Sequence, residues 1–489
     1  MSLEDAIETI IGRFGKYQSW VLFLILLGRY PTEFQLTNVV FILPSVNYVC
    51  KDDNAYNLTN HCPCRNPEYD QSTIVSSVTS EWNLICDRTS LASLSQSMLQ
   101  VGILAGSLVY GYVSDRYGRK ISTINAFFFT ALFGVLAAVS PQLWMFIVCR
   151  FFIGMSLGGT MLCAYILLIE ISGKSFRPYV VGLEGISYVT GYFAQPIIAY
   201  YLREWRYLIL VTSAPWLLVV AYYWLLPESP RWLITVGKKK QAIDLLTYIA
   251  KKNNRPTENI ERIVSELDSI ESNNEQRGTY LDLFKTPKIR KYTIVNVLVW
   301  MCCAHTFFGI NQYIGRLDGN LYLNVMLSAV VLAPGLVLVV LSSLYLKRKV
   351  SIIVSFCTAA VPLLIFIFLP KDMPTATLAF AIIGQLGAYT SFILTYLYSC
   401  ELFPTVVRNS AMGLASVFAR FASFVAPFVV NIGIEWVSIL IFSGLAFCAA
   451  FLCLFLPETK DIVLFNTIDQ VEQPKERKTN DNKTAYLKQ

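Results

Sequence analysis

Long apolar runs decide what this chain can fold into. A bilayer core requires about 20 apolar residues for each helix that crosses it, and only 15% of the 489 residues are charged. A soluble protein carries about a quarter charged residues. We therefore predict an all-α polytopic membrane protein with twelve transmembrane helices, near residues 19–44, 91–113, 121–140, 143–169, 178–201, 207–226, 292–314, 321–346, 351–370, 374–399, 409–432 and 434–456.

Basic residues and cysteines predict the orientation of these helices. If the helices alternate, the loops at 116–120, 174–177, 238–240 and 347–349 share one side, and their Lys and Arg residues mark it as cytoplasmic. Both termini join that side. The opposite side receives residues 45–90, whose cysteines and glycosylation sequon suit an oxidising extracellular face. This loop holds one candidate glycosylation site and four disulfide candidates with three possible pairings, namely Asn57, Cys50, Cys62, Cys64 and Cys86.

Two motifs recur at nearly one spacing along the chain. The Glu-to-Arg segments 170–177 and 401–408 lie 231 positions apart, and the Pro-Glu pairs 227–228 and 457–458 lie 230 apart. Such a repeat predicts two pseudo-symmetric six-helix bundles. The predicted domains are a cytoplasmic N-terminus (1–18), an N-terminal bundle (19–226), a cytoplasmic linker of short amphipathic helices (227–291), a C-terminal bundle (292–456) and a cytoplasmic tail (457–489).

One loop between predicted helices reads Gly111-Tyr-Val-Ser-Asp115-Arg116-Tyr-Gly118-Arg119-Lys120. A tight bend with one acid and three bases is costly in hydrocarbon and stable at a membrane face, and Asp115 can cap the next helix. The plain alternative is a hydrophilic turn. The repeat predicts a second copy near 345–350, where the bases Lys347, Arg348 and Lys349 remain but the Asp and Gly are gone. We therefore expect a degraded second copy.

The loop resembles the one between helices 2 and 3 of the major facilitator superfamily. Segments 150–154, 227–233 and 457–460 are similar to its sugar-porter-like branch, and the cysteine-bearing outer loop with Glu401–Asn409 narrows the resemblance to the organic cation, organic anion and carnitine transporter family. The resemblance implies alternating access, in which two bundles rock about a central site and cytoplasmic latches hold the outward-open state. The implied latch residues are Gly111, Asp115, Arg116, Gly118, Arg119, Glu170, Arg177, Glu401 and Arg408.

Arg420 is the strongest candidate for the substrate site. It lies 12 residues beyond Arg408, about 18 Å into its predicted helix. In the family that the chain resembles, this position, seven residues before Pro427, selects substrate charge: cation carriers have Asp there, and anion and carnitine carriers have Arg. A guanidinium pairs well with a carboxylate, so a carboxylate-bearing substrate is favoured. The alternative is that Arg420 pairs with a helix acid and only holds the bundles together.

Four further ionisable residues inside predicted helices are candidates, because burial without a partner costs several kcal/mol. Glu184 either holds the positive end of a zwitterion or neutralises Arg420. Glu33, which is also a candidate substrate contact, and Arg150 lie at similar depths and are a possible ion pair. Arg29 has no assigned role.

Aromatic residues would complete an organic-ion site by stacking and cation–π contact. Two tyrosines share a helix face with Glu184, and two further aromatic pairs match positions in the anion-carrying relatives of the family. These candidates are Tyr188, Tyr192, Phe307, Phe308, Phe392 and Tyr396. His305 is expected to be a hydrogen-bonded packing residue, with a proton relay as the alternative.

We therefore predict a secondary transporter of small organic anions or zwitterions, carnitine-like molecules included, in the plasma membrane. The first alternative is a cation carrier of the same fold, with Glu184 or Glu33 as the anionic anchor. The second is a non-transporting sensor or scaffold. No nucleophile–base set, phosphate loop or metal-site spacing predicts an enzyme, a cofactor or a metal site, and no basic arm predicts nucleic-acid binding. The expected partners are the substrate and the lipid bilayer, and a coupling ion or counter-substrate is left open.

Overall fold

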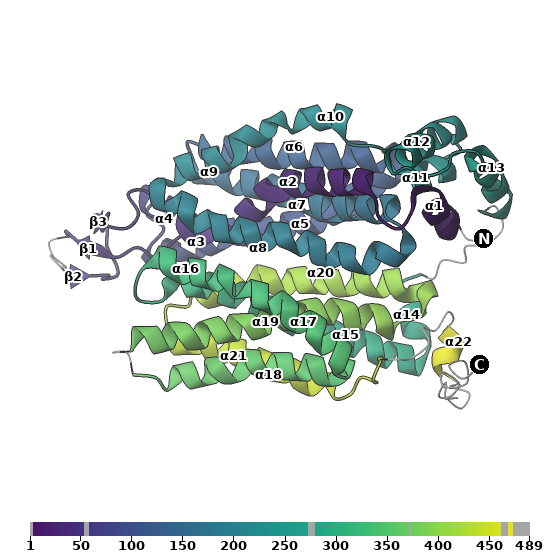
Figure 1. The fold of residues 1–489 in the computed structure, drawn as a ribbon. Helices are drawn as coiled ribbons and strands as arrows, with labels where there is room; N and C mark the ends of the chain where they lie inside the picture. The colour runs from purple at the N-terminus through teal and green to yellow at the C-terminus, as the bar shows by residue number, and fades with distance from the viewer. Residues whose placement is uncertain (1–2, 53–57, 272–278, 371–372, 461–467, 473–489) are drawn as a thin grey trace.

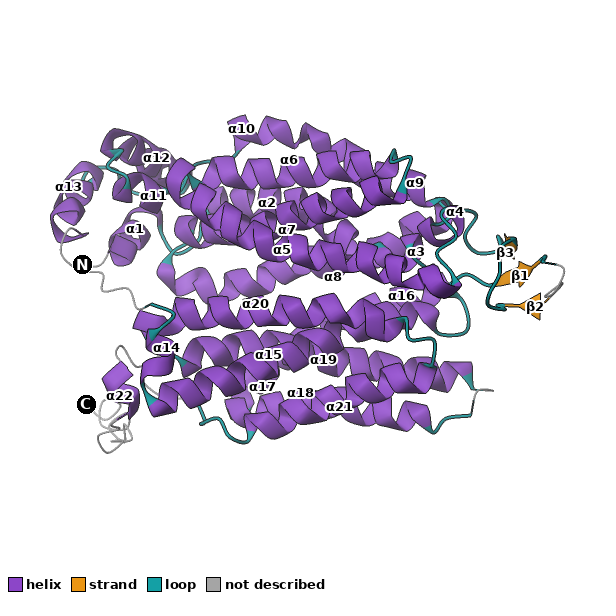
Figure 2. Cartoon of the chain, turned by 180° about the vertical axis from the view of Figure 1, so that it is seen from behind, coloured by secondary structure: helices purple, strands orange, loops and turns teal. Residues whose placement is uncertain are grey.

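Two helix bundles, one from each half of the chain, lie side by side (Figure 1). The computed structural model describes residues 3–52, 58–271, 279–370, 373–460 and 468–472. We call the end that carries the three strands the loop end. The opposite end, here the linker end, carries α1 (Leu3–Ile11), the linker helices and α22 (Ile468–Glu472), as both views show (Figures 1 and 2).

The N-terminal bundle is built around a very close helix pair. A Cβ added to Gly106 of α5 would lie 1.9 Å from the carbonyl oxygen of Met155 on α7. A Cβ added to Gly102 would lie 2.1 Å from the carbonyl oxygen of Phe151 on the same helix. Small residues are what allow two helices to approach so closely in a membrane. The bundle contains α2 (Lys16–Thr37), α3 (Val39–Ile42), α5 (Thr89–Tyr117), α6 (Arg119–Ala138), α7 (Leu143–Ile171), α8 (Arg177–Tyr201) and α9 (Trp205–Ser213), which runs through a 3-10 segment (Ala214–Ala221) into α10 (Tyr222–Leu225).

The C-terminal bundle is built from a similar series of long helices, one of which is interrupted. The predicted helix 321–346 forms two helices separated at Val331, because Pro334 has no N–H to donate to the carbonyl of Val330. The bundle contains α15 (Pro287–Tyr313), α16 (Leu321–Val330), α17 (Leu332–Tyr345), α18 (Arg348–Ile367), α19 (Pro374–Leu402), α20 (Thr405–Val430) and α21 (Glu435–Cys453).

The fold class predicted from the sequence is confirmed. Among the described residues, 10 helical segments are long and apolar enough to cross a membrane, or up to 11 if α1 and α2, bent by 105° relative to each other, count as one span. The remaining predicted segment corresponds to α8, whose 25 residues include Glu184 and Gln195 and are therefore less apolar. Each of the twelve predicted segments is thus helical in the structure.

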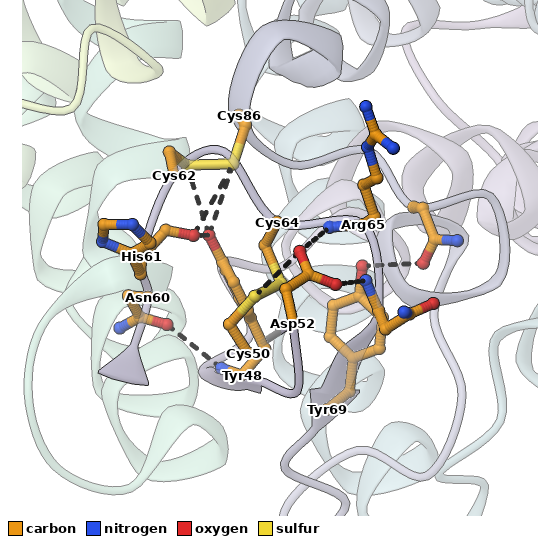
Figure 3. The surroundings of a disulfide bond; sticks show 12 residues. Tyr48, Cys50, Asp52, Asn60, His61, Cys62, Cys64, Arg65, Tyr69 and Cys86 are labelled. Carbon is orange, nitrogen blue, oxygen red and sulfur yellow. Dashed lines mark hydrogen bonds between the residues drawn. A yellow bond between two sulfur atoms is a disulfide. The ribbon is translucent and has the colours of Figure 1, made fainter. Parts of the chain in front are cut away.

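The loop-end segment holds a small sheet that the all-helical prediction missed. Its order is β2-β1-β3, antiparallel, with β1 (Tyr48–Cys50), β2 (Leu58–Thr59) and β3 (Pro67–Tyr69); the short α4 (Val78–Glu81) follows. Of the three possible pairings, the structure has Cys50–Cys64 and Cys62–Cys86 (Figure 3). Because Cys50 and Cys64 are bonded to each other, these sulfurs and the nearby Asp52 do not form a thiolate metal site. The predicted glycosylation site Asn57 lies outside the described residues.

Short amphipathic helices fill the linker, as expected from its composition. They are α11 (Pro230–Thr235), α12 (Lys239–Lys252), α13 (Ile260–Glu271) and α14 (Asp282–Lys285). Their apolar faces bury Leu233, Leu246 and Ile249 against Ile7 and Ile11 of α1, so the N-terminal helix and the linker share one small core. The predicted domain boundaries remain predictions, and most of the tail lies outside the described residues.

Candidate functional site

Hydrogen bonds join the two bundles near the loop end. On α5, Ser93 Oγ donates to the carbonyl of Pro427 at 3.3 Å, and Ser97 Oγ donates to that of Phe424 on α20 at 2.7 Å. Gln312 Nε2 on α15 donates to Gln96 Oε1 at 2.6 Å. These contacts close the loop-end part of the interface, and the candidates Phe307, Phe308 and Arg420 lie farther from the loop end along α15 and α20.

At the linker end, the N-terminal bundle forms a cage of carboxylates around the start of α6. Glu228 Oε1 accepts the backbone N–H groups of Arg119 at 2.8 Å and Lys120 at 3.0 Å. The Arg119 guanidinium pairs with Glu170 (Nε–Oε2, 3.3 Å) and with Asp115 (Nη1–Oδ1, 2.6 Å). Burial raises the pKa of the Glu228 carboxyl, against the lowering effect of these N–H groups. We call this set the N-cage.

Gly118 is required by the geometry of the N-cage. Its φ is +110°, and a Cβ there would lie 2.3 Å from Glu228 Oε2. The other predicted latch residues are more peripheral: Gly111 lies within α5, Arg177 begins α8, and the exposed Arg116 donates to the Tyr112 hydroxyl at 2.5 Å. Their predicted latch roles stay predictions.

The C-terminal bundle has an equivalent cage, so the expectation of a degraded second copy is wrong. Glu458 accepts the backbone N–H groups of Arg348 at 2.8 Å and Lys349 at 3.1 Å, and Arg348 Nε lies 3.1 Å from Glu401 Oε1. The cage forms without the Asp and the Gly, because the N–H groups at the start of α18 and the Arg348 side chain supply the donors. We call this set the C-cage. The predicted latch residue Arg408 donates instead to the Phe403 carbonyl at 3.4 Å.

Deeper in the N-terminal bundle, one guanidinium pairs with a buried carboxylate, that of Glu33, and a partly buried one, that of Glu184. Arg29 Nη1 lies 2.9 Å from Glu184 Oε1, and Arg29 Nε donates to Glu33 Oε1 at 3.3 Å. Ser187 Oγ also donates to Glu33, at 3.4 Å. With both carboxylates ionised, this acid cluster (Arg29, Glu33 and Glu184) carries a formal charge of −1. Since Glu184 pairs with Arg29, the alternative that it neutralises Arg420 is contradicted.

The predicted ion pair between Glu33 and Arg150 is wrong. Arg150 is fully buried, and its Nη1 donates to the Gln35 side-chain oxygen at 3.3 Å and the Gln35 carbonyl at 3.4 Å. Glu33 lies four residues after Arg29 on α2, so those two side chains meet on one helix face. Helix periodicity thus favours the pair of Glu33 with Arg29 on the same helix over a pair of Glu33 with Arg150 on α7.

Arg420 lies on α20 among aromatic side chains. Its guanidinium carbon is 6.0 Å from the centre of the Phe308 ring, and its Nη1 donates to Gln100 Oε1 at 3.4 Å. Among the residues that the structure describes, it forms no ion pair, so the alternative in which it pairs with a helix acid is contradicted. The cavity beside it, lined also by Trp300 and Tyr396, has a volume of about 10 Å³.

A chain of aromatic rings connects the acid cluster with Arg420. Neighbouring ring centres lie 6.3, 6.1, 5.0 and 6.4 Å apart, within the range of favourable aromatic contacts. Tyr396 joins the chain at 5.5 Å from Phe392. We call it the aromatic chain; in order it contains Tyr188, Tyr389, Phe307, Phe392 and Phe308.

The remaining predicted residues have structural contacts. Tyr192 is buried, and its hydroxyl donates to Asn311 Oδ1 at 3.0 Å, which ties α8 to α15. His305 Nδ1 lies 2.9 Å from the Ala422 carbonyl oxygen, as expected of a hydrogen-bonded packing residue. The sequence left Arg29 without a role and did not indicate Tyr389. The ion pair of Arg29 could have been predicted from its position one helical turn before Glu33. Nothing in the sequence distinguishes Tyr389 from the many other aromatic residues.

Comparisons with known proteins agree with this arrangement. Residues 37–470 match the family described as "Sugar (and other) transporter". The chain resembles the inward-open xylose transporter XylE from E. coli with a TM-score of 0.68 and 17% identity, over 91% of this chain and 97% of that one. A match at this identity supports the fold.

Curated relatives narrow the family. The chain is 30% identical to the organic cation transporter protein of Drosophila melanogaster, over 96% of this chain and 94% of that protein. It is 30% identical to the human organic cation/carnitine transporter 2, over 97% of this chain and 95% of that protein. It is 33% identical to solute carrier family 22 member 3 of Mus musculus, over 81% of this chain and 72% of that protein. The protein is thus a multi-pass secondary transporter and not an enzyme. The chain belongs to the major facilitator superfamily and, within it, to the solute carrier 22 family of organic cation and carnitine transporters.

Proposed function

We propose that this protein transports small zwitterions or organic anions that carry a carboxylate, carnitine-like molecules included. One observation supports the proposal: Arg420 lies near an aromatic ring between the bundles, and its one polar contact among the described residues is an amide oxygen. A guanidinium is an effective carboxylate ligand, because its N–H groups match both oxygens. A substrate carboxylate would therefore supply the charge partner that Arg420 lacks among the described residues.

The acid cluster supports a zwitterion in particular. It has one more carboxylate than guanidinium, and Glu184 is 13% exposed, whereas Glu33 is 1% exposed. The aromatic chain leads from this cluster to Arg420, and ring faces attract organic cations. We infer that the cationic end of the substrate lies near Glu184 and its carboxylate end near Arg420.

A cation carrier is the second candidate, favoured by the same acid cluster. One buried and one partly buried carboxylate with a single arginine would be an anionic anchor for an organic cation. In that case Arg420 would be a structural residue bonded to Gln100, and its removal would leave uptake intact.

The size of the cavity beside Arg420, which residues of α15, α19 and α20 line, supports transport by alternating access. A volume of about 10 Å³ is close to the minimum for one water molecule, so an organic ion cannot occupy this conformation of the site. The helices that line this cavity must therefore move to admit the substrate, and we propose that they do so as the bundles rock relative to each other. The break between α16 and α17 and the hydrogen bonds between α5 and α20 are where such motion would act.

The test is uptake in cells that express the chain, read by mass spectrometry with a panel of carnitine-like zwitterions, monocarboxylates, dicarboxylates and quaternary amines. Wild type is compared with Arg420→Ala, Arg420→Lys and Arg420→Asp, with surface expression measured for each. The control is Arg203→Ala, which removes a guanidinium at the loop end of α8. Each substrate is measured with and without sodium and at two pH values to reveal a coupling ion.

We expect Arg420→Ala and Arg420→Asp to reduce uptake of carboxylate-bearing substrates at least tenfold at equal surface expression. A charge-assisted hydrogen bond contributes about 1.5–3 kcal/mol, which is a tenfold effect or more. Uptake restricted to quaternary amines and indifferent to Arg420→Ala would contradict the proposal and support the cation carrier. Binding without flux would indicate a sensor.

We also propose that the protein lies in the plasma membrane with its loop end outside and the linker end in the cytoplasm. Two disulfides at the loop end suit an oxidising face. The test is an epitope inserted near Leu58 and another after Gln489 in intact cells. Labelling of the first alone supports this orientation, and loss of a glycan in Asn57→Gln would place the same loop outside.

A further inference from the structure

A groove opens between the linker helix α12 and the linker end of the N-terminal bundle. Its volume is about 720 Å³, within the range of about 300–1,000 Å³ typical of small-molecule sites. Its walls come from the start of α2, the end of α10 and one face of α12, which lie together at the linker end (Figure 1). None of these walls belongs to the central site.

The rim of the groove is cationic. Lys16 is the first residue of α2, Lys252 is the last residue of α12, and both are exposed. The described residues that line the groove include these two lysines and no acid. Lys252 Nζ lies 5.6 Å from the centre of the Tyr248 ring, a cation–π contact that places the ammonium group beside a residue lining the groove. The rim therefore favours an anion.

The wall that continues into the membrane-spanning region is apolar and aromatic. Trp20, one turn into α2, is 47% exposed, and Trp224, near the end of α10, is 76% exposed. Exposed tryptophans at the ends of spanning helices are typical of the boundary between hydrocarbon and headgroups. The groove thus combines a cationic rim with a surface suited to acyl chains.

We propose that this groove binds an anionic phospholipid from the leaflet at the linker end. Its phosphate would lie between Lys16 and Lys252, and its chains would descend along Trp20 and Trp224. Basic pockets beside spanning helices bind such headgroups by this combination of charge and apolar contact. The lipid would bridge the linker and the N-terminal bundle, where Asn253 Oδ1 already accepts the Tyr17 N–H at 3.1 Å.

The test uses the full-length protein purified in a neutral detergent. Native mass spectrometry measures binding of phosphatidylserine and of phosphatidylcholine with the same acyl chains. The groove variant is Lys16→Gln with Lys252→Gln. The matched control is Lys240→Gln with Lys251→Gln, which removes the same charge from exposed lysines that do not line the groove. Thermal unfolding confirms that each variant is folded, and inorganic phosphate is added as a separate competitor.

We expect wild type to prefer phosphatidylserine. The groove variant should lose about 25-fold in affinity for it, since each lysine near an anionic headgroup contributes about fivefold. The Lys16→Arg with Lys252→Arg variant should keep the preference, and so should the matched control. Equal loss in groove and control variants, no preference in wild type, or full competition by inorganic phosphate would each overturn the proposal.

Discussion

The N-cage and the C-cage hold the same chemistry with different residues around it. Both place a carboxylate, Glu228 or Glu458, on two backbone N–H groups at the start of a helix, and both pair one arginine with a glutamate. The N-cage adds the exposed Asp115 and requires a glycine, and the C-cage does without either. The shared part is therefore an arginine whose backbone N–H binds one glutamate and whose side chain pairs with another, and the Asp and Gly occur in the N-cage alone.

The two halves differ far more at the centre of the molecule. The N-terminal bundle places Arg29 between two carboxylates, whereas the C-terminal bundle has Arg420 against an aromatic ring and an amide. The two halves thus resemble each other where the helices end and differ where the substrate is proposed to bind. Four predictions test this comparison.

The largest difference between the cages is expected at Gly118. Gly118→Ala places a Cβ 2.3 Å from Glu228 Oε2 at a φ of +110°, and such backbone strain alone costs about 1–3 kcal/mol. The matched variant Lys347→Ala changes a residue with a φ of −67°, where an exposed substitution alters stability by about 0.5 kcal/mol or less. Thermal unfolding in detergent should therefore show a large loss for the first and almost none for the second. Equal losses would contradict the asymmetry.

The shared arginine–glutamate pairs are expected to be equally important. Glu170→Gln removes the partly buried carboxylate partner of Arg119, which keeps only the exposed Asp115, and Glu401→Gln removes the carboxylate partner of Arg348. Breaking a buried pair costs about 3–5 kcal/mol, and we expect about half of that here because the pairs are 9–20% exposed. Both variants should lower the unfolding temperature to a similar extent. A loss in Glu170→Gln alone would mean that the C-cage is degraded in function.

At the centre, Glu184→Gln should separate substrates by their charge. It removes a carboxylate from the acid cluster but leaves the Arg420 contacts unchanged. If the cationic end of a zwitterion lies there, its apparent affinity should fall about tenfold, as for a charged hydrogen bond of about 1.5 kcal/mol. Uptake of a simple monocarboxylate should change little. Concentration-dependent uptake measures both, and an equal effect on the two substrates would contradict this placement.

The smallest effect is expected from Asp115→Asn. The Asp115 side chain is 76% exposed, and its ion pair with Arg119 has no counterpart in the C-cage. Exposed ion pairs contribute about 0–1 kcal/mol, so stability and uptake should stay within about twofold of wild type. A complete loss of transport at normal surface expression would show that the additional acid acts in the transport cycle rather than in holding the fold.

Local patterns in the sequence were sufficient for much of this architecture. Apolar runs, the repeat of Glu and Pro-Glu motifs, and the concentration of cysteines in one loop are properties of neighbouring residues, so hydropathy and spacing identify them. The same reasoning placed Arg420, Glu184 and Glu33 inside helices, where an ionisable residue is unusual. The small sheet was missed because strands of two or three residues have no periodicity to detect.

The sequence by itself therefore determined the twelve helices, the two halves and the few charged residues that lie inside the helices. Only the tertiary structure decided which charges meet: Arg29 rather than Arg420 with Glu184, Gln35 rather than Glu33 with Arg150, and Arg348 with Glu401. It also selected one cysteine pairing among three. The physical reason is distance. A contact energy depends on a few ångströms between side chains on different helices, and those distances are set by how the helices pack rather than by the order of residues along the chain.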